Sequence, residues 1–310
     1  MDCITKNGIN ISKMTLGTVQ LGMNYGVNNS AGMPSEEQSF SILDAAYKGG
    51  VTILDTSDDY GKSEEIIGKY LMQNPDKHFD ICTKFKVTKE TSKDIYSALK
   101  AFAIASAKKL SIGKIPIFMS HTEENFTEYS NRLIDALKEL KQEGIIQNAA
   151  ISISDKSSID RIIESGGFDA VQLPLNILDN REIQNGTIKK MSDAGIAVFV
   201  RSVYLQGLFF SKQEDLLNSN LKDAAPLVRR IAEIAEEEGL STAQLALAFI
   251  RDTEGVDSLV MGSETKEQVK QNIEMFNTPK LSSKTKELIL EEFKEVDPFI
   301  ISPWEWAKKK

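Results

Sequence analysis

The stretch from Val51 to Gly61 reads VTILDTSDDYG, and it decides the fold prediction. Its first four residues are β-branched or apolar, which is typical of a short buried strand. The strand is expected to stop at Asp55, and a polar loop then delivers Tyr60. Ser63 is expected to be the N-cap of the next helix. An acid at the carboxyl end of an apolar strand, followed by a phenol, places two ionisable groups at the mouth of a barrel or sheet.

Two further strands repeat this arrangement. The apolar run 79–83 leads to Lys84, and the run 115–120 leads to His121. Taken singly, each of these residues has an ordinary interpretation, such as a loop cap for Asp55 or a packing role for Tyr60. An acid, a phenol, a lysine and a histidine at the ends of three successive strands form a far more specific pattern than any one of them.

Strands and helices alternate along the whole chain. A hairpin is expected at residues 3–12 around the turn signal Asn7-Gly8, followed by a first buried strand from Met14 to near Gly22. Counted from this strand, eight strand–helix units follow the hairpin. Their strands are continuously apolar, as in a parallel sheet buried on both faces. We therefore predict one domain, residues 1–310, folded as an α/β (β/α)8 TIM barrel with an N-terminal β-hairpin and a short C-terminal tail.

A doubly wound parallel sheet is the alternative fold. It requires a glycine-rich phosphate loop near the first strand, and the stretch 16–22 is a poor match to G-x-G-x-x-G.

Composition limits the classes of partner. The 310 residues carry a net charge of −8 with a pI of about 5.1, which argues against a nucleic-acid or anionic-membrane surface. Cys3 and Cys82 are far apart, so neither a disulfide framework nor a cysteine metal cluster is expected. The chain shows no apolar N-terminal run and no membrane span, so we expect a cytoplasmic protein, either a monomer or a small homo-oligomer.

Asp55, Ser57 and Asp59 resemble the start of a calcium loop. That loop needs glycine at its sixth position and glutamate at its twelfth, where this chain has Tyr60 and Ile66. We predict no metal site.

Asp55, Tyr60, Lys84 and His121 match, in order and strand placement, the catalytic tetrad of the aldo-keto reductases, and the resemblance covers nearly the whole chain. It implies reduction of an aldehyde or ketone by a nicotinamide cofactor, or the reverse alcohol oxidation. The residues suit this chemistry: Tyr60 is the proton donor, and a buried Lys84 ammonium stabilises the phenolate. Asp55 keeps Lys84 charged, and His121 donates a hydrogen bond to the substrate oxygen or shares in the proton transfer.

The cofactor signal is spread along the chain. Gly262 and Ser263 precede a helix whose start, Thr265 to Gln268, is spaced as a capping box, and backbone N–H groups there suit a phosphate. The resemblance implies cofactor contacts at Gly17, Thr18, Asp55, Ser152, Gln172, Arg201, Ser202, Tyr204, Gln206, Gly262, Ser263, Gln268, Gln271 and Asn272. Within this set, Ser152 and Gln172 correspond to the nicotinamide carboxamide.

The chain departs from the family pattern at several cofactor positions. Arg201 stands where many members carry an aromatic residue that stacks on the nicotinamide, and a guanidinium plane can also stack. The family's Ser-Asn pair is Ser152-Ile153 here, which removes one amide contact. Glu264 lies where Lys or Arg often binds the 2′-phosphate of the cofactor, although Lys266 and Lys270 could compensate. The resemblance favours NADP(H), with NAD(H) as the alternative.

Substrate identity is weakly encoded. The resemblance points to a pocket that includes Met23, Asn24, Tyr25, Tyr204, Phe299, Trp304 and Trp306. Aromatic and amide groups together suit a sugar-like carbonyl compound, whereas the two tryptophans could equally anchor the tail.

Two other functions remain open from the sequence. The first is a cofactor-binding sensor or subunit with negligible turnover. The second is a barrel lyase or isomerase that uses Lys84 as a Schiff-base amine.

Overall fold

The computed structural model describes residues 1–24, 32–154 and 156–306. An N-terminal hairpin consists of β1 (Cys3–Lys6) and β2 (Ile9–Ser12). The remaining strands are β3 (Met14–Gly17), β4 (Ile53–Asp55), β5 (Asp80–Phe85), β6 (Ile115–Ser120), β7 (Ile146–Ser152), β8 (Ala170–Pro174), β9 (Ala197–Arg201) and β10 (Ser258–Gly262).

The α-helices are α1 (Val19–Gly22), α2 (Glu36–Lys48), α3 (Ser63–Gln73), α4 (Ile95–Leu110), α5 (Glu124–Gln142), α6 (Ile159–Ser165), α7 (Arg181–Gln184), α8 (Thr187–Asp193), α9 (Gln213–Leu217), α10 (Ala225–Glu237), α11 (Thr242–Arg251), α12 (Lys266–Met275), α13 (Ser283–Glu292) and α14 (Pro303–Trp306). Short 3-10 helices are η1 (Thr91–Asp94), η2 (Lys156–Ser158), η3 (Leu205–Phe210) and η4 (Lys222–Ala224).

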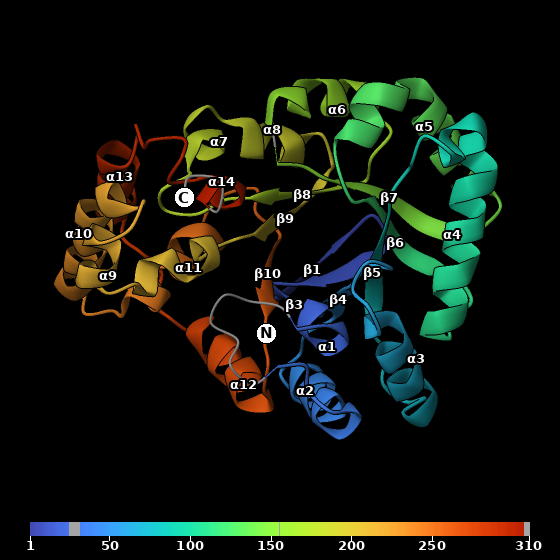
Figure 1. The fold of residues 1–310 in the computed structure, drawn as a ribbon, viewed down its shortest axis with the longest axis horizontal. Helices are drawn as coiled ribbons and strands as arrows, with labels where there is room; N and C mark the ends of the chain where they lie inside the picture. The colour runs from blue at the N-terminus through green and yellow to red at the C-terminus, as the bar shows by residue number, and fades with distance from the viewer. Residues whose placement is uncertain (25–31, 155, 307–310) are drawn as a thin grey trace.

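Strands β3 to β10 form one closed barrel, and the helices surround it (Figure 1). Neighbouring strands run parallel, and β10 pairs with β3 from Leu259 opposite Met14 to Gly262 opposite Gly17, which closes the sheet. The (β/α)8 prediction is therefore confirmed. The doubly wound alternative is wrong, because an open sheet would leave β3 or β10 with a free edge.

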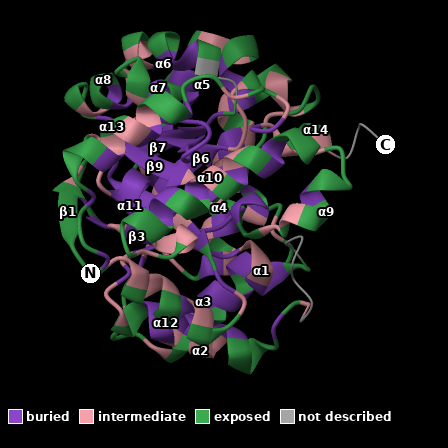
Figure 2. Ribbon diagram, turned by 90° about the vertical axis from the view of Figure 1, so that its left-hand side faces the viewer, coloured by how far each residue is buried: buried purple, intermediate pink, exposed green. Residues whose placement is uncertain are grey.

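The barrel has two hydrophobic layers, because successive strand residues point to opposite faces. One face packs against the helices, as with Leu54, Ile81 and Phe118, and belongs to the large cluster between strands and helices (Figure 2). The other face fills the barrel interior. The interior cluster contains Ile9, Ile11, Ile53, Cys82, Ile117, Met119, Ala150, Ala170, Ala197 and Phe199.

The predicted hairpin is confirmed, and it closes the amino-terminal end of the barrel. Asn7 and Gly8 adopt positive φ values of 53° and 72°, as a tight two-residue turn requires. The Asn7 amide donates to the carbonyl oxygens of Asp169 and Gly195, just before β8 and β9. Ile9 and Ile11 then enter the interior cluster.

Several predicted boundaries are wrong in detail. The first barrel strand ends at Gly17 rather than near Gly22, because the chain turns into the helix α1 at Val19. The unit after β8 contains two short helices, α7 and α8, where the predicted alternation has one helix. Ser63 is the first residue of α3, and Lys62 holds the N-cap position.

Two absences hold for the described residues. None of their helices is long and apolar enough to cross a membrane. No group of three or more His, Cys, Asp and Glu side chains among them could hold a metal ion. Tyr25 and the terminal lysines 308–310 lie outside the described residues.

Candidate active site

Side chains along each barrel strand point alternately inward and outward, and this explains why residues from distant strands meet at the barrel mouth. Asp55, Lys84 and His121 each lie two residues beyond a member of the interior cluster, namely Ile53, Cys82 and Met119. The same spacing relates Ala150 to Ser152, Ala170 to Gln172 and Phe199 to Arg201. Because a strand has a two-residue period, all six side chains face the barrel axis at its carboxyl end.

Lys84 is the buried centre of the site. Its side chain is 1% exposed, and Nζ donates to Asp55 Oδ1 at 2.8 Å and to the Thr56 carbonyl oxygen at 2.8 Å. Burial alone would lower the pKa of the Lys84 ammonium, but the Asp55 carboxylate and the Tyr60 phenol raise that pKa above its ordinary value. Lys84 therefore carries a fixed positive charge in a water-poor site.

Tyr60 and His121 lie against this ammonium. Lys84 Nζ is 4.9 Å from the centroid of the Tyr60 ring, and the His121 ring meets Tyr60 edge-on with centroids 5.9 Å apart. Burial, together with the charges of Lys84 and Lys86, lowers the pKa of His121 to about 4. His121 is therefore neutral at physiological pH.

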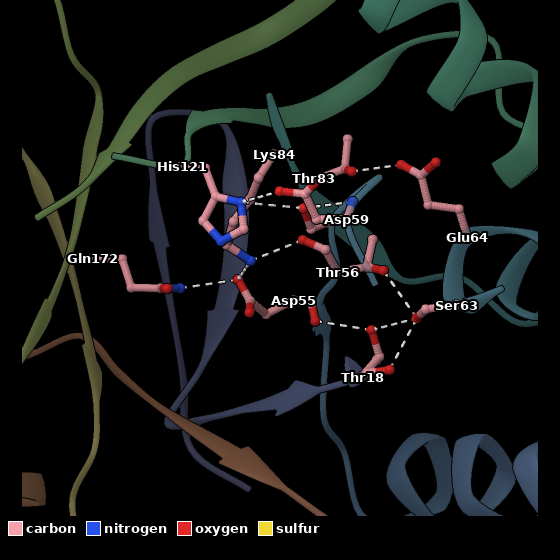
Figure 3. Close-up of polar contacts among 11 residues, drawn as sticks. Thr18, Asp55, Thr56, Asp59, Ser63, Glu64, Thr83, Lys84, His121 and Gln172 are labelled. Carbon is pink, nitrogen blue, oxygen red and sulfur yellow. Dashed lines mark hydrogen bonds and ion pairs between the residues drawn. The ribbon is translucent and has the colours of Figure 1, made fainter. Parts of the chain in front are cut away.

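A network of hydroxyl groups holds the loop that carries Tyr60 (Figure 3). Thr18 Oγ1 donates to the Asp55 carbonyl oxygen at 2.9 Å, and Thr56 Oγ1 donates to Ser63 Oγ at 3.0 Å. Ser63 Oγ in turn lies 3.0 Å from the Thr18 carbonyl oxygen. Ser63 was predicted to be an N-cap, whereas its hydroxyl ties the start of α3 to Thr18, the residue after β3.

The predicted nicotinamide positions border the tetrad. Gln172 Nε2 donates to Asp55 Oδ1 at 2.9 Å, so this side chain also anchors the carboxylate that holds Lys84. Ser152 pairs with Gln172 across β7 and β8, and both are buried. Arg201 Nη2 donates to the Ile153 carbonyl oxygen at 3.1 Å and to Ser154 Oγ at 2.8 Å, which fixes the guanidinium at the barrel mouth.

The loop after β9 turns sharply at the positions predicted for the pyrophosphate. Ser202, Leu205 and Gln206 have φ values of 63°, 47° and 53°. Left-handed residues in a turn can make backbone N–H groups converge on an anion. Tyr204 differs, because its hydroxyl contacts Met275 Sδ at 3.7 Å and its ring packs edge-on against Phe210.

The predicted capping box at the start of α12 is only half formed. Thr265 Oγ1 accepts from the Gln268 backbone N–H at 3.1 Å. The Gln268 side chain instead accepts from the Glu264 N–H at 2.6 Å, one residue earlier than predicted. Asn272 Nδ2 donates to the buried Ser263 Oγ at 3.1 Å, whereas Gln271 is exposed. Two N–H groups at this helix start are therefore already satisfied by the protein.

The C-terminal tail is anchored by Trp306. Its Nε1 donates to the Phe299 carbonyl oxygen at 3.0 Å, and its ring packs on the large cluster. Trp304 is 51% exposed and lines a surface pocket of about 560 Å³ with residues of the loops after β7 and β8. No member of the tetrad lines that pocket.

Three residues near the tetrad were missed in the sequence analysis. Thr56 receives a hydrogen bond from Lys84, while Ser57 and Asp59 contact His121. The sequence signal for this role is only that they lie between Asp55 and Tyr60, since Ser57 and Asp59 were otherwise weighed as part of a calcium-loop pattern.

Comparison with known proteins decides the family. The model of the Aldo/keto reductase family matches residues 13–291. This chain belongs to the aldo/keto reductase family. The structure of an aldo-keto reductase from Bacillus halodurans superposes with a TM-score of 0.77, at 21% identity over 94% of this chain and 96% of that one.

Sequence relatives of this aldo-keto reductase are distant. An uncharacterized oxidoreductase of Bacillus subtilis is 26% identical over 88% of this chain and 90% of its own. The NADH-specific methylglyoxal reductase of Escherichia coli is 24% identical over 87% of this chain and 91% of its own. Members of the family are oxidoreductases that use nicotinamide cofactors.

Proposed function

We propose that this protein reduces an aldehyde or ketone to an alcohol with a nicotinamide cofactor, or runs the reverse oxidation. The observation that carries the proposal is the buried Lys84 ammonium, held 2.8 Å from Asp55 Oδ1 and 4.9 Å from the centroid of the Tyr60 ring. A fixed positive charge beside a phenol in a site of low dielectric stabilises the phenolate. Tyr60 can then release a proton to a carbonyl oxygen and take it back from an alcohol.

Each residue has a distinct role in this proposal. When bound, the nicotinamide supplies or accepts the hydride at the substrate carbon. Tyr60 transfers the proton at the substrate oxygen, and Lys84 stabilises the charge that this leaves on the phenol. Asp55 and Gln172 hold Lys84 through the hydrogen bonds described above. His121, edge-on beside the Tyr60 ring, hydrogen-bonds to the same oxygen or shares in the proton transfer.

The residues at the barrel mouth fit a dinucleotide. Gln20 Oε1 is buried and accepts no hydrogen bond from the described protein atoms, so it is available to a ribose hydroxyl. A Cβ at Gly262 would meet Gln20 Nε2 at 2.6 Å, which shows how closely these two elements approach. The fixed Arg201 and the turn at Ser202 to Gln206 suit the nicotinamide and the pyrophosphate.

The choice between NADP(H) and NAD(H) depends on charge at the start of α12. A groove of about 460 Å³ adjoins it, and the described lining includes the carboxylates of Glu37, Glu264 and Glu267. The ammonium of Lys266 in the same lining lies 3.9 Å from Glu267 Oε1. A 2′-phosphate would add about −2 charge to this groove, whereas a carboxylate can accept from a free ribose 2′-hydroxyl.

These contacts favour NAD(H), which the sequence left as the alternative to NADP(H). The NADH specificity of the Escherichia coli relative points the same way. We expect NADH to bind at least about tenfold more tightly than NADPH in calorimetric titrations. Glu264→Lys should reduce the difference in affinity between NADH and NADPH. Lys138→Glu, on the distant α5, should leave this difference unchanged. Tighter binding of NADPH by the unmodified protein would restore the NADP(H) assignment.

The Schiff-base alternative is weakened by the state of Lys84. An amine must lose its proton to attack a carbonyl, and Asp55 raises the pKa of this lysine while both contacts hold its hydrogens. Borohydride trapping of a substrate on Lys84 would revive this alternative.

The sharpest test of the proposed function is Tyr60→Phe. The ring and its packing are retained while the proton donor is lost, so turnover on a good carbonyl substrate should fall about 10²–10⁴-fold. Affinity for the cofactor, measured by fluorescence titration, should stay within about twofold. Unmodified protein that binds the cofactor but oxidises NADH with no member of a broad carbonyl panel would support the sensor alternative.

A further inference from the structure

Glu64 is a buried carboxylate that the proposed mechanism does not use. It is 1% exposed, and its Oε1 accepts a hydrogen bond from Thr83 Oγ1 at 2.6 Å (Figure 3). Its Oε2 is also buried and has no hydrogen-bond partner among the described atoms. A carboxylate in this state is costly unless a positive charge compensates it. Lys109 supplies that charge, with Nζ 3.6 Å from Glu64 Oε2.

The same ammonium group pairs with a second carboxylate. Lys109 Nζ donates to Asp58 Oδ1, and Asp58 lies in the loop after β4, two residues before Tyr60. The hydrogen bond to Asp58 raises the pKa of Lys109 above its ordinary value, and the charges of Asp58 and Glu64 add to this effect, whereas burial opposes it. Lys109 is therefore charged and holds two carboxylates at once.

Each carboxylate leads to one member of the tetrad. Asp58 belongs to the loop that carries Tyr60. Glu64 binds Thr83, the residue that directly precedes Lys84 on β5. Successive residues of a strand point to opposite faces, so this contact fixes β5 from the side of the helices while Lys84 faces the barrel axis. A single cation thus joins the loop that carries the phenol to the strand that carries the ammonium of the site.

The backbone of Lys109 is fixed by helix packing. The residue lies in the last turn of α4, where a positive charge suits the helix dipole. A Cβ added at Gly68 of α3 would lie 2.0 Å from the Lys109 carbonyl oxygen, so the backbones of α3 and α4 touch at this residue. The ammonium group of Lys109 therefore extends from a rigid position.

We propose that Lys109 is a positioning residue that sets the separation between the Tyr60 phenol and the Lys84 ammonium. This inference rests on the proposed function, in which that separation governs how readily the phenol ionises. The side chains of Lys109 and Asp58 are 36% and 44% exposed, so their pairing contributes little to stability. Its effect is on geometry, because a small displacement of a catalytic group is costly to turnover even where stability is nearly unchanged.

The ionisation of Tyr60 is measured without turnover. Tyrosine labelled with ¹³C at Cζ gives an NMR signal for each of the seven tyrosines, and the signal that disappears in Tyr60→Phe belongs to Tyr60. Lys109→Met keeps the length of the side chain and removes its charge. In this variant the Tyr60 phenol should ionise at least about half a pH unit higher than in the unmodified protein. An unmoved Tyr60 titration overturns the proposal.

Asp58→Ala separates position from charge. Removal of a negative charge by itself makes a nearby phenol easier to ionise. Loss of the contact with Lys109 instead frees the loop, so we expect Tyr60 to ionise at higher pH, as in Lys109→Met. This variant keeps the buried pair of Glu64 with Lys109, so its folding does not depend on that pair. A shift of the Tyr60 titration to lower pH in Asp58→Ala would overturn the proposal.

A double variant separates position from stability. Lys109→Met leaves the Glu64 charge uncompensated, so the urea midpoint should fall by at least about 0.5 M. Adding Glu64→Gln removes that charge and keeps an acceptor for Thr83, so the midpoint should recover while the Tyr60 titration stays shifted. Recovery of both would show that Lys109 acts through stability alone, against the proposal.

Kinetics with matched controls complete the test. On a good carbonyl substrate, kcat should fall about tenfold in Lys109→Met while KM stays within about twofold. Lys109→Arg keeps the charge, and Lys108→Met removes the exposed neighbouring lysine, so both should stay within about threefold of the unmodified kcat. An equal loss of kcat in Lys108→Met and Lys109→Met would contradict the assignment. Absence of turnover with every carbonyl would instead defeat the proposed function, while the Tyr60 titration would still decide the role of Lys109.

Discussion

At the residue scale, the site depends on a lysine that is buried and yet charged. A buried lysine without a partner would be a liability, because an uncompensated ammonium in the interior costs several kcal/mol. Here Asp55 Oδ1 and the Thr56 carbonyl oxygen each lie 2.8 Å from Lys84 Nζ. Gln172 in turn holds Asp55, so the charge is fixed by groups from β4 and β8 as well as by its own strand.

The coupling within this group is testable in the oxidative direction, for which the proposed mechanism needs the phenolate as base. Lys84→Met should make the phenolate harder to form, so the low-pH limb of the pH–rate profile, where the phenol becomes protonated, should move to higher pH. The raised pKa of Lys84 keeps it protonated throughout that limb, so the loss of its charge affects the whole pH range in which the phenol titrates. Asp55→Asn should shift the limb in the same direction by a smaller amount.

Since these residues act as one unit, the double variant should lose much less activity than the product of the two single losses. Circular dichroism confirms folding of each variant. An unmoved low-pH limb in Lys84→Met would remove the lysine from the proposed mechanism.

At the element scale, the loop that carries Tyr60 is positioned by close contact between two backbones. Gly22 ends α1, and a Cβ added there would lie 1.7 Å from the Tyr60 carbonyl oxygen. Gly61, with φ of 57°, faces it, and a Cβ there would lie 2.3 Å from the Gly22 carbonyl oxygen. The Lys62 N–H donates to that same oxygen at 3.2 Å. Close backbone contact at these two glycines therefore positions the loop that carries Tyr60 against α1.

Gly22→Ala should therefore displace Tyr60. The methyl group would overlap backbone atoms that cannot rotate away, so we expect a loss of about 3 kcal/mol in unfolding free energy. Turnover of the folded protein should fall at least about tenfold, because small misplacements of catalytic groups are costly. Gly113→Ala is the matched control, since nothing lies within 4 Å of a Cβ there. Equal stability and activity in the two variants would contradict the proposed contact.

At the scale of the whole molecule, stability and chemistry occupy opposite ends of the barrel. The hairpin covers the amino-terminal end, where Ile9 and Ile11 are 3% and 1% exposed inside the barrel. The proposed active site lies at the carboxyl ends of the strands, where barrel enzymes place their chemistry.

Ile11→Ala should destabilise the fold by about 3 kcal/mol through the cavity it leaves, with kcat unchanged at temperatures where the protein is folded. Ile4 lies on the same hairpin but is 37% exposed, so Ile4→Ala should change stability by less than about 0.5 kcal/mol. Urea unfolding of both variants gives the comparison. A similar loss of unfolding free energy in both variants would show that the hairpin stabilises the fold through contacts other than those in the barrel interior.

Local signals in the sequence were sufficient for the architecture. Apolar strands, glycine turns and helix periodicity act over a few residues, so the alternation of strands and helices and the hairpin at Asn7-Gly8 were predictable. The end of the first strand was not, because the short stretch VQLG (19–22) carries no signal that separates strand from helix, and packing against α3 selects the helix. The assignment of residues 1–310 to a single domain stays a prediction.

By itself, the sequence determined the fold class, the family and the positions of Asp55, Lys84 and His121 at successive strand ends. Only the tertiary structure decided which groups these residues meet. Gln172 reaches Asp55 across 117 residues, and Asp59 reaches His121 across a loop and a strand. The physical reason is barrel closure: it brings all the strand ends around one axis, where distances between side chains depend on register and strand tilt rather than on separation along the chain.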